Sequence, residues 1–182
     1  MKLFIKNILT EEDKEWLRNT LNELSISYEQ DIVLGELVVA PGTEPEKLVQ
    51  LKTRLLQKNL VILHDRKTIL SEQLKLLVFD MFRPNQPIME NYSVYISNRM
   101  QLNYTYLANI FSELNGITIE HYIINQKLEV AKQLLLSGDY NIGEIADALN
   151  YSSIGHFSNQ FKKVTGINPS EFKKKEKETV TQ

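Results

Sequence analysis

The sequence contains no cysteine, and it has no long apolar run. Without cysteine, the 182-residue chain forms no disulfide, holds no metal through a thiolate and has no cysteine nucleophile. Its apolar runs are far shorter than the roughly 20 residues of a membrane-spanning helix. The N-terminal MKLFIKN also lacks the apolar core and the small-residue cleavage site of a signal peptide. These features predict a cytoplasmic protein.

The chain also lacks a net positive charge. Its 21 basic and 23 acidic residues give a formal net charge of −2 at pH 7, whereas DNA-binding domains are usually basic. From residue 68 onward, eleven basic residues are opposed by twelve acidic ones, but six of the eleven lie between Lys162 and Lys177. Any attraction for a polyanion is therefore expected to be local and close to this segment.

The usual arrangements of catalytic and cofactor-binding residues are missing as well. The three histidines, His64, His121 and His156, lie in separate segments and have neither metal-ligand nor catalytic-triad spacing. The sequence has no phosphate-binding glycine loop. We therefore expect neither an enzyme, nor a cofactor, nor a metal site.

The first 67 residues predict a small α+β domain. Strand-like alternation or helical periodicity is found, in turn, over residues 2–8, 10–24, 26–40 (with a turn at Gly35), 45–56 and 60–63. Because the turn at Gly35 divides its segment into two strands, the order is βαββαβ. That order predicts a ferredoxin-like sandwich with two helices on one face of an antiparallel sheet.

In order and length, residues 1–67 resemble the heavy-metal-associated domains. Those domains carry a Cys-x-x-Cys pair in the loop after the first strand, where this chain has Thr10 and Asp13. Neither residue is a soft metal ligand, so copper or zinc binding of that kind is not expected. We interpret the segment as a scaffold without metal ligands, with dimerisation or sensing as its candidate roles.

The sharpest pattern in the chain spans residues 141–175, NIGEIADALNYSSIGHFSNQFKKVTGINPSEFKKK. Apolar residues at helical spacing predict one short helix before Asn150 and a second with Phe157, Phe161 and Val164 on one stripe. Between the helices, Asn tolerates a left-handed backbone and Ser is a good N-cap, so residues 150–153 predict a tight corner. Such a helix-turn-helix unit can place its second helix in a DNA major groove.

The same stretch, written IxEIAxxLxYSSxxHFSxxFKKVTGxxPSEFKK, resembles the C-terminal signature of the AraC/XylS family of bacterial transcription regulators. The resemblance also includes YLxxxFxxxxG at residues 106–116. It implies an all-α, homeodomain-like double helix-turn-helix domain over residues 68–175. Independently of the resemblance, residues 176–182 are charged and have little to bury, which predicts a disordered tail. The chain departs from the family at Asn109 and Asn159, where members often have Arg, and at Lys127 of the linker helix, where Arg is usual.

An internal repeat supports a duplicated unit without reference to any family. The pattern FxxLxGI that begins at Phe111 recurs 50 residues later as FxxVxGI, beginning at Phe161. Leu107 matches Phe157, and Asn109 matches Asn159, at the same spacing. Two helix-turn-helix units joined by a linker helix, predicted at residues 119–136, can place two helices in successive major grooves.

The candidate DNA-contacting residues are those that helical rotation places away from the apolar stripes, together with the predicted N-caps. The base-reading candidates are Asn159, Gly155 and His156 in the second helix, and Thr105, Ala108 and Asn109 in the first. The backbone-contacting candidates are Ser153, Lys162, Lys163 and Asn103. Asn159 leads because an Asn amide pairs bidentately with adenine. The first helix has no Lys or Arg, so weaker contacts are expected there.

These patterns favour a sequence-specific, DNA-binding transcription regulator of the AraC/XylS type. Its expected partner is double-stranded DNA, and a second copy of the chain and RNA polymerase are further candidates; the sequence identifies no effector. One alternative is a metal-handling regulator, suggested by the N-terminal resemblance. Another is a protein-interaction regulator with weak or lost DNA binding, suggested by the acidic balance and by the two Asn residues.

Overall fold

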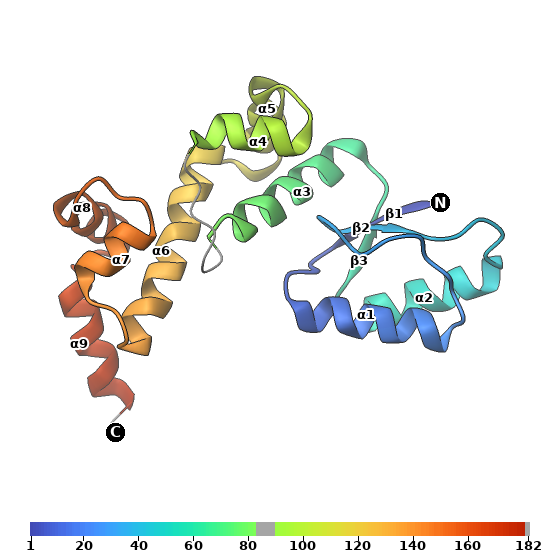
Figure 1. Cartoon of the computed structure of the whole chain (residues 1–182), viewed down its shortest axis with the longest axis horizontal. Helices are drawn as coiled ribbons and strands as arrows, with labels where there is room; N and C mark the ends of the chain where they lie inside the picture. Colours follow the sequence, from blue (N-terminus) through green and yellow to red (C-terminus); the bar gives the residue numbers. More distant parts are fainter. Residues whose placement is uncertain (83–89, 181–182) are drawn as a thin grey trace. The chain divides into compact units, whose positions relative to one another are not determined.

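The computed structural model describes residues 1–82 and 90–180, with side chains described up to residue 175 (Figure 1). Packing divides the chain into two compact units, residues 1–77 with 96–114, and residues 78–95 with 115–182. Within the described residues, no helix is long and apolar enough to span a membrane. The proline-containing segment 83–87, which its two prolines predict to be a loop, lies outside the described residues.

A three-stranded antiparallel sheet and two helices form the N-terminal part of the first unit. Strands β1 (Lys2–Lys6), β2 (Glu36–Val38) and β3 (Val61–Leu63) are arranged in the order β2-β1-β3. Helices α1 (Glu11–Glu23) and α2 (Pro45–Gln57) lie side by side and cover one face of the sheet (Figure 1). The buried core between them is aliphatic and consists of Ile5, Ile8, Leu17, Leu21, Leu24, Ile26, Ile32, Leu37, Val39, Leu51, Leu55 and Leu60.

Local sequence explains where both helices begin. The Thr10 hydroxyl accepts a hydrogen bond from the Asp13 amide at 3.1 Å, and the Asp13 carboxylate accepts one from the Thr10 amide at 2.9 Å, forming a capping box. Burial alone would raise the pKa of Asp13, but the hydrogen bonds that its carboxylate accepts from the Thr10 amide and hydroxyl lower it overall. Pro45 is the first residue of α2. An amide hydrogen at this position would have no partner within the helix, so proline is tolerated there. Thr10 and Asp13, which stand where a metal-binding pair was considered, therefore bond to each other.

The fourth strand of the expected ferredoxin-like sandwich is not a regular strand. Residues 26–34 take part only in the isolated bridges Tyr28↔Val39 and Val33↔Glu36. The segment is bounded by positive φ angles, at Ser25 (51°) before it and at Leu34 (47°) and Gly35 (75°) at its end, where extended pairing stops. The structure therefore shows a three-stranded sheet, and it confirms neither the βαββαβ fold nor the likeness to heavy-metal-associated domains.

The remaining elements are helices. They are α3 (Arg66–Asp80), α4 (Tyr92–Met100), α5 (Tyr104–Asn115), α6 (Ile119–Ser137), α7 (Ile142–Ala148), α8 (Ile154–Thr165) and α9 (Pro169–Val180). Asp65 accepts a hydrogen bond from the Thr68 amide at 2.8 Å at the start of α3. The boundary predicted at residue 67 falls in the first turn of this helix, and the division into 1–67 and 68–175 stays a prediction.

The C-terminal helix is longer than the sequence indicated. The helix α9 continues to Val180, within residues 176–182, for which a disordered tail is predicted; the disorder stays a prediction. Its last turns read KEKETV, and Lys and Glu are good helix formers even where they bury little surface. Residues 181–182 lie outside the described residues.

Two glycines of the first unit provide a matched test of how closely the turn before β2 packs against β1. Both have positive φ, 75° at Gly35 and 83° at Gly42, so alanine is strained at either position. A Cβ at Gly35 would lie 2.7 Å from the Ile5 carbonyl oxygen, whereas one at Gly42 would meet nothing within 4 Å. In urea denaturation, Gly42→Ala should cost about 1–2 kcal/mol of unfolding free energy, and Gly35→Ala should cost clearly more. Equal losses would contradict this packing.

Candidate nucleic-acid interface

The repeat seen in the sequence is present in the backbone. Helices α4 and α7 begin 50 residues apart, at Tyr92 and Ile142, and α5 and α8 are both 12 residues long and begin 50 residues apart. Both second helices end before a glycine with a left-handed backbone, Gly116 at φ 70° and Gly166 at φ 83°. The predicted duplication of a helix-turn-helix unit is therefore confirmed at the level of its elements.

The corner of the second unit is built from capping residues. Asn141 and Glu144 form a capping box at the start of α7, with bonds of 2.7 and 3.0 Å. Asn150 then takes a left-handed backbone (φ 53°), and the Tyr151 amide bonds back to the Ala146 carbonyl at 2.9 Å. The Ser153 hydroxyl accepts a bond from the His156 amide at 3.1 Å and begins α8. The chain thus changes direction within a few residues.

Contacts between aromatic rings hold α8 against the rest of its unit. Phe157 and Phe161 are fully buried, and their ring centroids are 5.7 Å apart. Tyr151 packs on Phe157 at 5.2 Å, and Phe172 of α9 packs on Phe161 at 5.5 Å. This cluster fixes the rotation of α8 about its axis, because only one face of the helix carries large apolar side chains that are buried.

One residue of the predicted apolar stripe does not face the core. The sequence predicted that Val164 faces the core with Phe157 and Phe161, but 47% of its surface is exposed. Val164 lies almost one turn beyond Phe161, and α8 ends at the next residue, Thr165. The apolar stripe therefore extends past the part of the helix that is covered.

The opposite face of α8 is exposed and polar. Asn159 lies two positions after Phe157 and two before Phe161, so rotation of about 100° per residue points it directly away from both rings. Gly155, Lys162 and Lys163 are also exposed on this side or its flanks. The two lysines stand in the last turn of α8, where the helix dipole stabilises positive charge. This face combines an amide, a bare backbone position and two cations.

Gly155 is not required by the fold. A Cβ added there would have only the Ser153 hydroxyl oxygen within 4 Å, at 3.8 Å, and Gly155 has an ordinary helical φ. A glycine inside a helix is destabilising by roughly 0.5–1 kcal/mol relative to alanine. Packing therefore does not explain the glycine, but close approach of another molecule to α8 would.

His156 and Ser153 are partly engaged within the corner. The His156 Nδ1 lies 3.0 Å from the Ser152 hydroxyl, and its ring meets Tyr151 edge to face at 5.3 Å. The Ser153 hydroxyl is used as the N-cap. Both residues are nevertheless exposed. His156 can offer only Nε2 to DNA while these contacts hold, so it is less free to read a base than Asn159 is.

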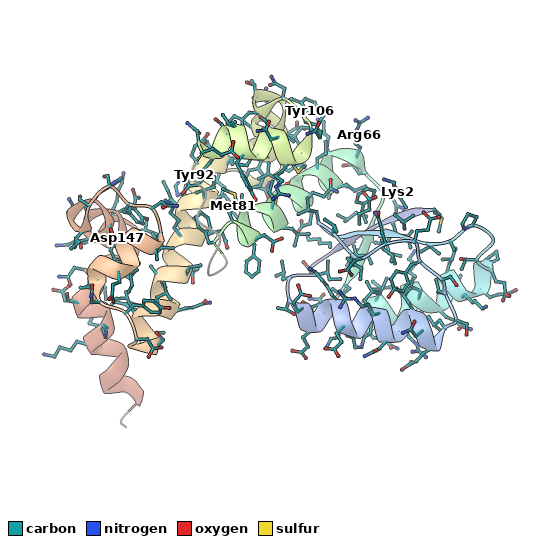
Figure 2. The ribbon with its side chains drawn as sticks, in the orientation of Figure 1. Lys2, Arg66, Met81, Tyr92, Tyr106 and Asp147 are labelled. Atoms are coloured by element: carbon teal, nitrogen blue, oxygen red, sulfur yellow. The ribbon has the colours of Figure 1, made fainter. Side chains whose placement is uncertain are left out.

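The candidates in the first unit lie on α5. Asn103 caps this helix, because its side-chain oxygen accepts bonds from the Thr105 and Tyr106 amides at 2.9 and 3.3 Å. Thr105 and Asn109 are exposed, and Ala108 is half-buried. Tyr106 is exposed on the same helix (Figure 2). Thr105 and Asn109 are thus accessible without restriction, whereas Asn103 is exposed but its side-chain oxygen is already used as the cap.

The end of α5 differs from that of α8 in charge and in packing. Leu114, predicted as part of the apolar stripe, is 45% exposed because it stands at the helix end like Val164. Glu113 is ion-paired with Lys67 of α3 at 2.8 Å, and both side chains are at least half-exposed. Where α8 ends with two lysines, α5 therefore ends with an acid that is already neutralised.

Sequence reasoning missed the support behind the second corner. Lys127 of α6 is only 7% exposed, and its Nζ lies 4.7 Å from the ring centre of Tyr151, 5.1 Å from Tyr92 and 5.9 Å from Phe82. The Tyr92 hydroxyl is hydrogen-bonded to the Asn150 side chain. The buried Tyr151 hydroxyl has no hydrogen-bond partner among the described residues.

The Lys127 aromatic box, formed by Lys127, Phe82, Tyr92 and Tyr151, joins α6 to the residues just before α8. Burial lowers the pKa of Lys127 to about 8 and raises that of Tyr151 to about 12. Attraction between the ammonium and the ring faces offsets part of the cost of burying the charge. A sequence signal existed, since Lys127 stands four residues after Ile123 and four before Ala131, both buried on α6.

Comparison with known proteins agrees with this geometry. Residues 96–175 match the sequence profile of a family described as "Helix-turn-helix domain". The "Uncharacterized HTH-type transcriptional regulator YtdP" of Bacillus subtilis is 30% identical over 82 residues, 45% of this chain and 11% of the relative. The "Uncharacterized transcriptional regulatory protein YesN" of the same species is 28% identical over 110 residues, 59% of this chain and 29% of the relative. Residues 96–175 therefore form a helix-turn-helix domain similar to those of these transcription regulators.

A solved structure shows the same fold for this part of the chain. It is described as "The C-terminal domain of AraT, a response regulator from Geobacillus stearothermophilus". The likeness has a TM-score of 0.53 at 22% identity and covers 61% of this chain and 88% of the other. This chain spans less than a third of the length of the two curated relatives, 11% and 29%. The comparisons therefore concern the helix-turn-helix domain.

Lys127 predicts an unusual dependence of stability on pH. Its folded pKa of about 8 lies below the ordinary value of 10.5, so the unfolded chain binds this proton more readily between those values. The unfolding free energy should therefore rise as pH increases from about 8 to 10, and Lys127→Met should add about 1–3 kcal/mol at pH 7. Urea denaturation at pH 7, 8, 9 and 10 measures both effects.

Lys132→Met on the same helix is the control, because Lys132 is partly exposed and ion-paired with Glu129 at 2.7 Å. It should leave the rise between pH 8 and 10 in place. Measurements should stop near pH 10, above which the raised pKa of Tyr151 makes the folded state lose stability. A Lys127→Met variant that is less stable at pH 7, with the parent's pH profile, would contradict the burial of an uncompensated charge.

Proposed function

We propose that this chain is a sequence-specific DNA-binding transcription regulator of the AraC/XylS type, with α8 as its principal recognition helix. The observation that carries the proposal is the two-sided character of α8. Phe157 and Phe161 are buried on one side, and Asn159 stands exposed on the other with Lys162 and Lys163 beside it. A helix of this kind, begun by a capped corner, is suited to entering a major groove.

The residues of α8 divide between reading bases and holding the DNA backbone. Asn159 offers a carbonyl oxygen and an amide, the pair that matches N6 and N7 of adenine. Lys162 and Lys163 supply charge for phosphates, and the free amide hydrogens of the first helical turn, beside Ser153, offer a further phosphate contact. Gly155 leaves space for the close approach of DNA to the helix.

Helix α5 is proposed as a second, weaker contact. Thr105 and Asn109 can reach base edges, Ala108 can contact a thymine methyl group, and Asn103 stands at the N-terminal end where a phosphate binds. No lysine or arginine lies on α5, so its contribution to affinity should be smaller than that of α8. A second copy of the chain and RNA polymerase are further candidate partners.

Asn159→Ala and Lys162→Ala separate base reading from backbone binding. On the preferred duplex, Asn159→Ala should lose about 1–3 kcal/mol of binding free energy, and its loss on random DNA should be much smaller. Lys162→Ala should weaken both duplexes equally and reduce the salt slope by about one ion. Fluorescence anisotropy titrations at roughly 50 to 200 mM salt measure the binding free energy and the salt slope. Over this range, the number of phosphate contacts strongly affects affinity.

The two variants serve as controls for each other, because both residues are exposed on the same helix. Circular dichroism should show unchanged folding in both. If Asn159→Ala weakens specific and random DNA equally, Asn159 does not read a base. If the salt slope of Lys162→Ala equals that of the parent protein, Lys162 does not contact a phosphate.

Gly155→Ala tests whether α8 enters the groove. The added methyl group meets no close neighbour, so folding stability should stay the same or rise by about 0.5–1 kcal/mol. In a groove, the same methyl group would keep the helix from its closest approach, and affinity for the preferred duplex should fall at least about tenfold, or 1.4 kcal/mol. Thermal unfolding and anisotropy on the same preparation give both values, and unchanged affinity would argue against insertion at this position.

A further inference from the structure

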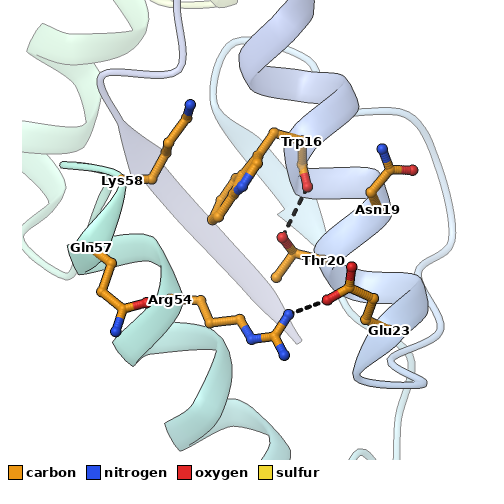
Figure 3. A pocket seen from close by; sticks show the side chains of 7 residues that line it. All are labelled: Trp16, Asn19, Thr20, Glu23, Arg54, Gln57 and Lys58. Carbon is orange, nitrogen blue, oxygen red and sulfur yellow. Dashed lines mark hydrogen bonds and ion pairs between the residues drawn. The ribbon is translucent and has the colours of Figure 1, made fainter.

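A pocket in the N-terminal part of the first unit has no role in the proposed DNA contact. It lies between α1 and α2, and its volume is about 500 Å³, within the range of about 300–1,000 Å³ typical of small-molecule sites. Figure 3 shows that α1 and the end of α2 supply all the side chains that line it. They are Trp16, Asn19, Thr20 and Glu23 from α1, and Arg54, Gln57 and Lys58 from α2 and its C-cap.

The floor of the pocket is apolar and held in place. Trp16 is the only tryptophan of the chain, and its half-buried side chain packs on the core of this unit. The Thr20 hydroxyl donates to the Trp16 carbonyl at 2.9 Å, so its proton is used within α1. The Trp16 ring extends from α1 toward α2 (Figure 3). An exposed side of an indole ring offers a stacking surface for a planar aromatic group.

The rim of the pocket carries a net positive charge. Arg54 and Lys58 are opposed by Glu23 alone among the lining residues. Arg54 contacts Glu23 through Nη1 (Figure 3), and the two side chains are 40% and 63% exposed. An ion pair this exposed contributes little, so the guanidinium can turn to another carboxylate and bind it through two nitrogens. The Lys58 ammonium attracts the Asp13 carboxylate, which does not line the pocket, and forms no ion pair among the described residues.

We propose that this pocket binds a planar aromatic monocarboxylate of one or two rings, with the ring on Trp16 and the carboxylate between Arg54 and Lys58. A single negative charge on the ligand neutralises the net positive charge of the rim, whereas a phosphate dianion or a nucleotide would leave an excess of negative charge. The amides of Asn19 and Gln57 stand on opposite helices and can bond to a polar substituent of the ring. This ligand would make the N-terminal part of the chain a small-molecule sensor.

The single tryptophan allows a direct test in the full chain. The Trp16 indole gives one N–H resonance in a ¹H–¹⁵N spectrum, and 2-naphthoate should shift it saturably. The neutral 2-naphthamide tests the charge, and cyclohexanecarboxylate tests the planar ring. Both should bind at least about tenfold more weakly than 2-naphthoate, because each lacks one of the two matching features. An equal response to all three compounds, or no saturable shift with 2-naphthoate, would overturn the proposal.

Matched variants locate the carboxylate. Arg54→Gln and Lys58→Gln should each weaken 2-naphthoate at least about tenfold, the loss of one charge-assisted hydrogen bond. Lys52→Gln is the control, since Lys52 is exposed on α2 but does not line the pocket, and its affinity should equal that of the parent. Losses of the same size in all three variants would show only general attraction to a basic helix. DNA affinity, measured separately, does not enter this outcome.

Discussion

The burial of Phe157 and Phe161 is the constraint on which the second helix-turn-helix unit depends. Each ring is fully buried, and together with Tyr151 and Phe172 they form a continuous series of ring contacts from the corner, through α8, to α9. Removing a phenylalanine from such a core typically costs about 3–5 kcal/mol. This energy fixes which side of α8 faces outward. The direction of Asn159 is therefore a consequence of packing on the other side of the helix.

Polar and charged groups of α4 and α6 contact the corner before α8, in addition to the apolar groups that pack on it. Asn150 takes the left-handed backbone, bonds to Tyr92 at the start of α4, and is followed by Tyr151, whose ring covers Lys127. No ion pair of Lys127 is found among the described residues, and a buried charge of this kind reduces stability, but the neighbouring aromatic rings hold the ammonium in one place. The Lys127 aromatic box thus links α6 to the beginning of the proposed recognition helix. Burying Lys127 lowers the folding stability, but it gives the corner before α8 a single conformation.

The two copies of the helix-turn-helix unit have diverged where they would meet DNA. Their second helices, α5 and α8, have equal lengths and matching glycine stops, so this part of the backbone has been kept. The chemistry differs, because α8 ends in two exposed lysines while α5 ends in Glu113 paired with Lys67. The sequence already indicated this difference in charge. The structure adds that the acid on α5 has a partner of its own.

The sequence was sufficient for features that depend on local interactions. The tight corner at residues 150–153 and the repeat with its 50-residue spacing could be predicted from short sequence patterns alone. Features that depend on distant neighbours were not predictable. The strand expected within residues 26–34 is reduced to bridges, Val164 is exposed at a helix end, and nothing local shows that Lys127 meets rings from α4 and the second corner.

The central claim, that α8 reads DNA through Asn159, is tested most directly by selecting duplexes from a random pool with the full chain and with its Asn159→Ala variant. The account predicts one enriched motif for the parent protein that includes a strongly preferred A·T pair, and the same motif with that single position relaxed for the variant. No enriched motif at low salt would contradict the assignment of DNA reading and favour a protein-interaction role. Identical motifs for both proteins would contradict the role of Asn159.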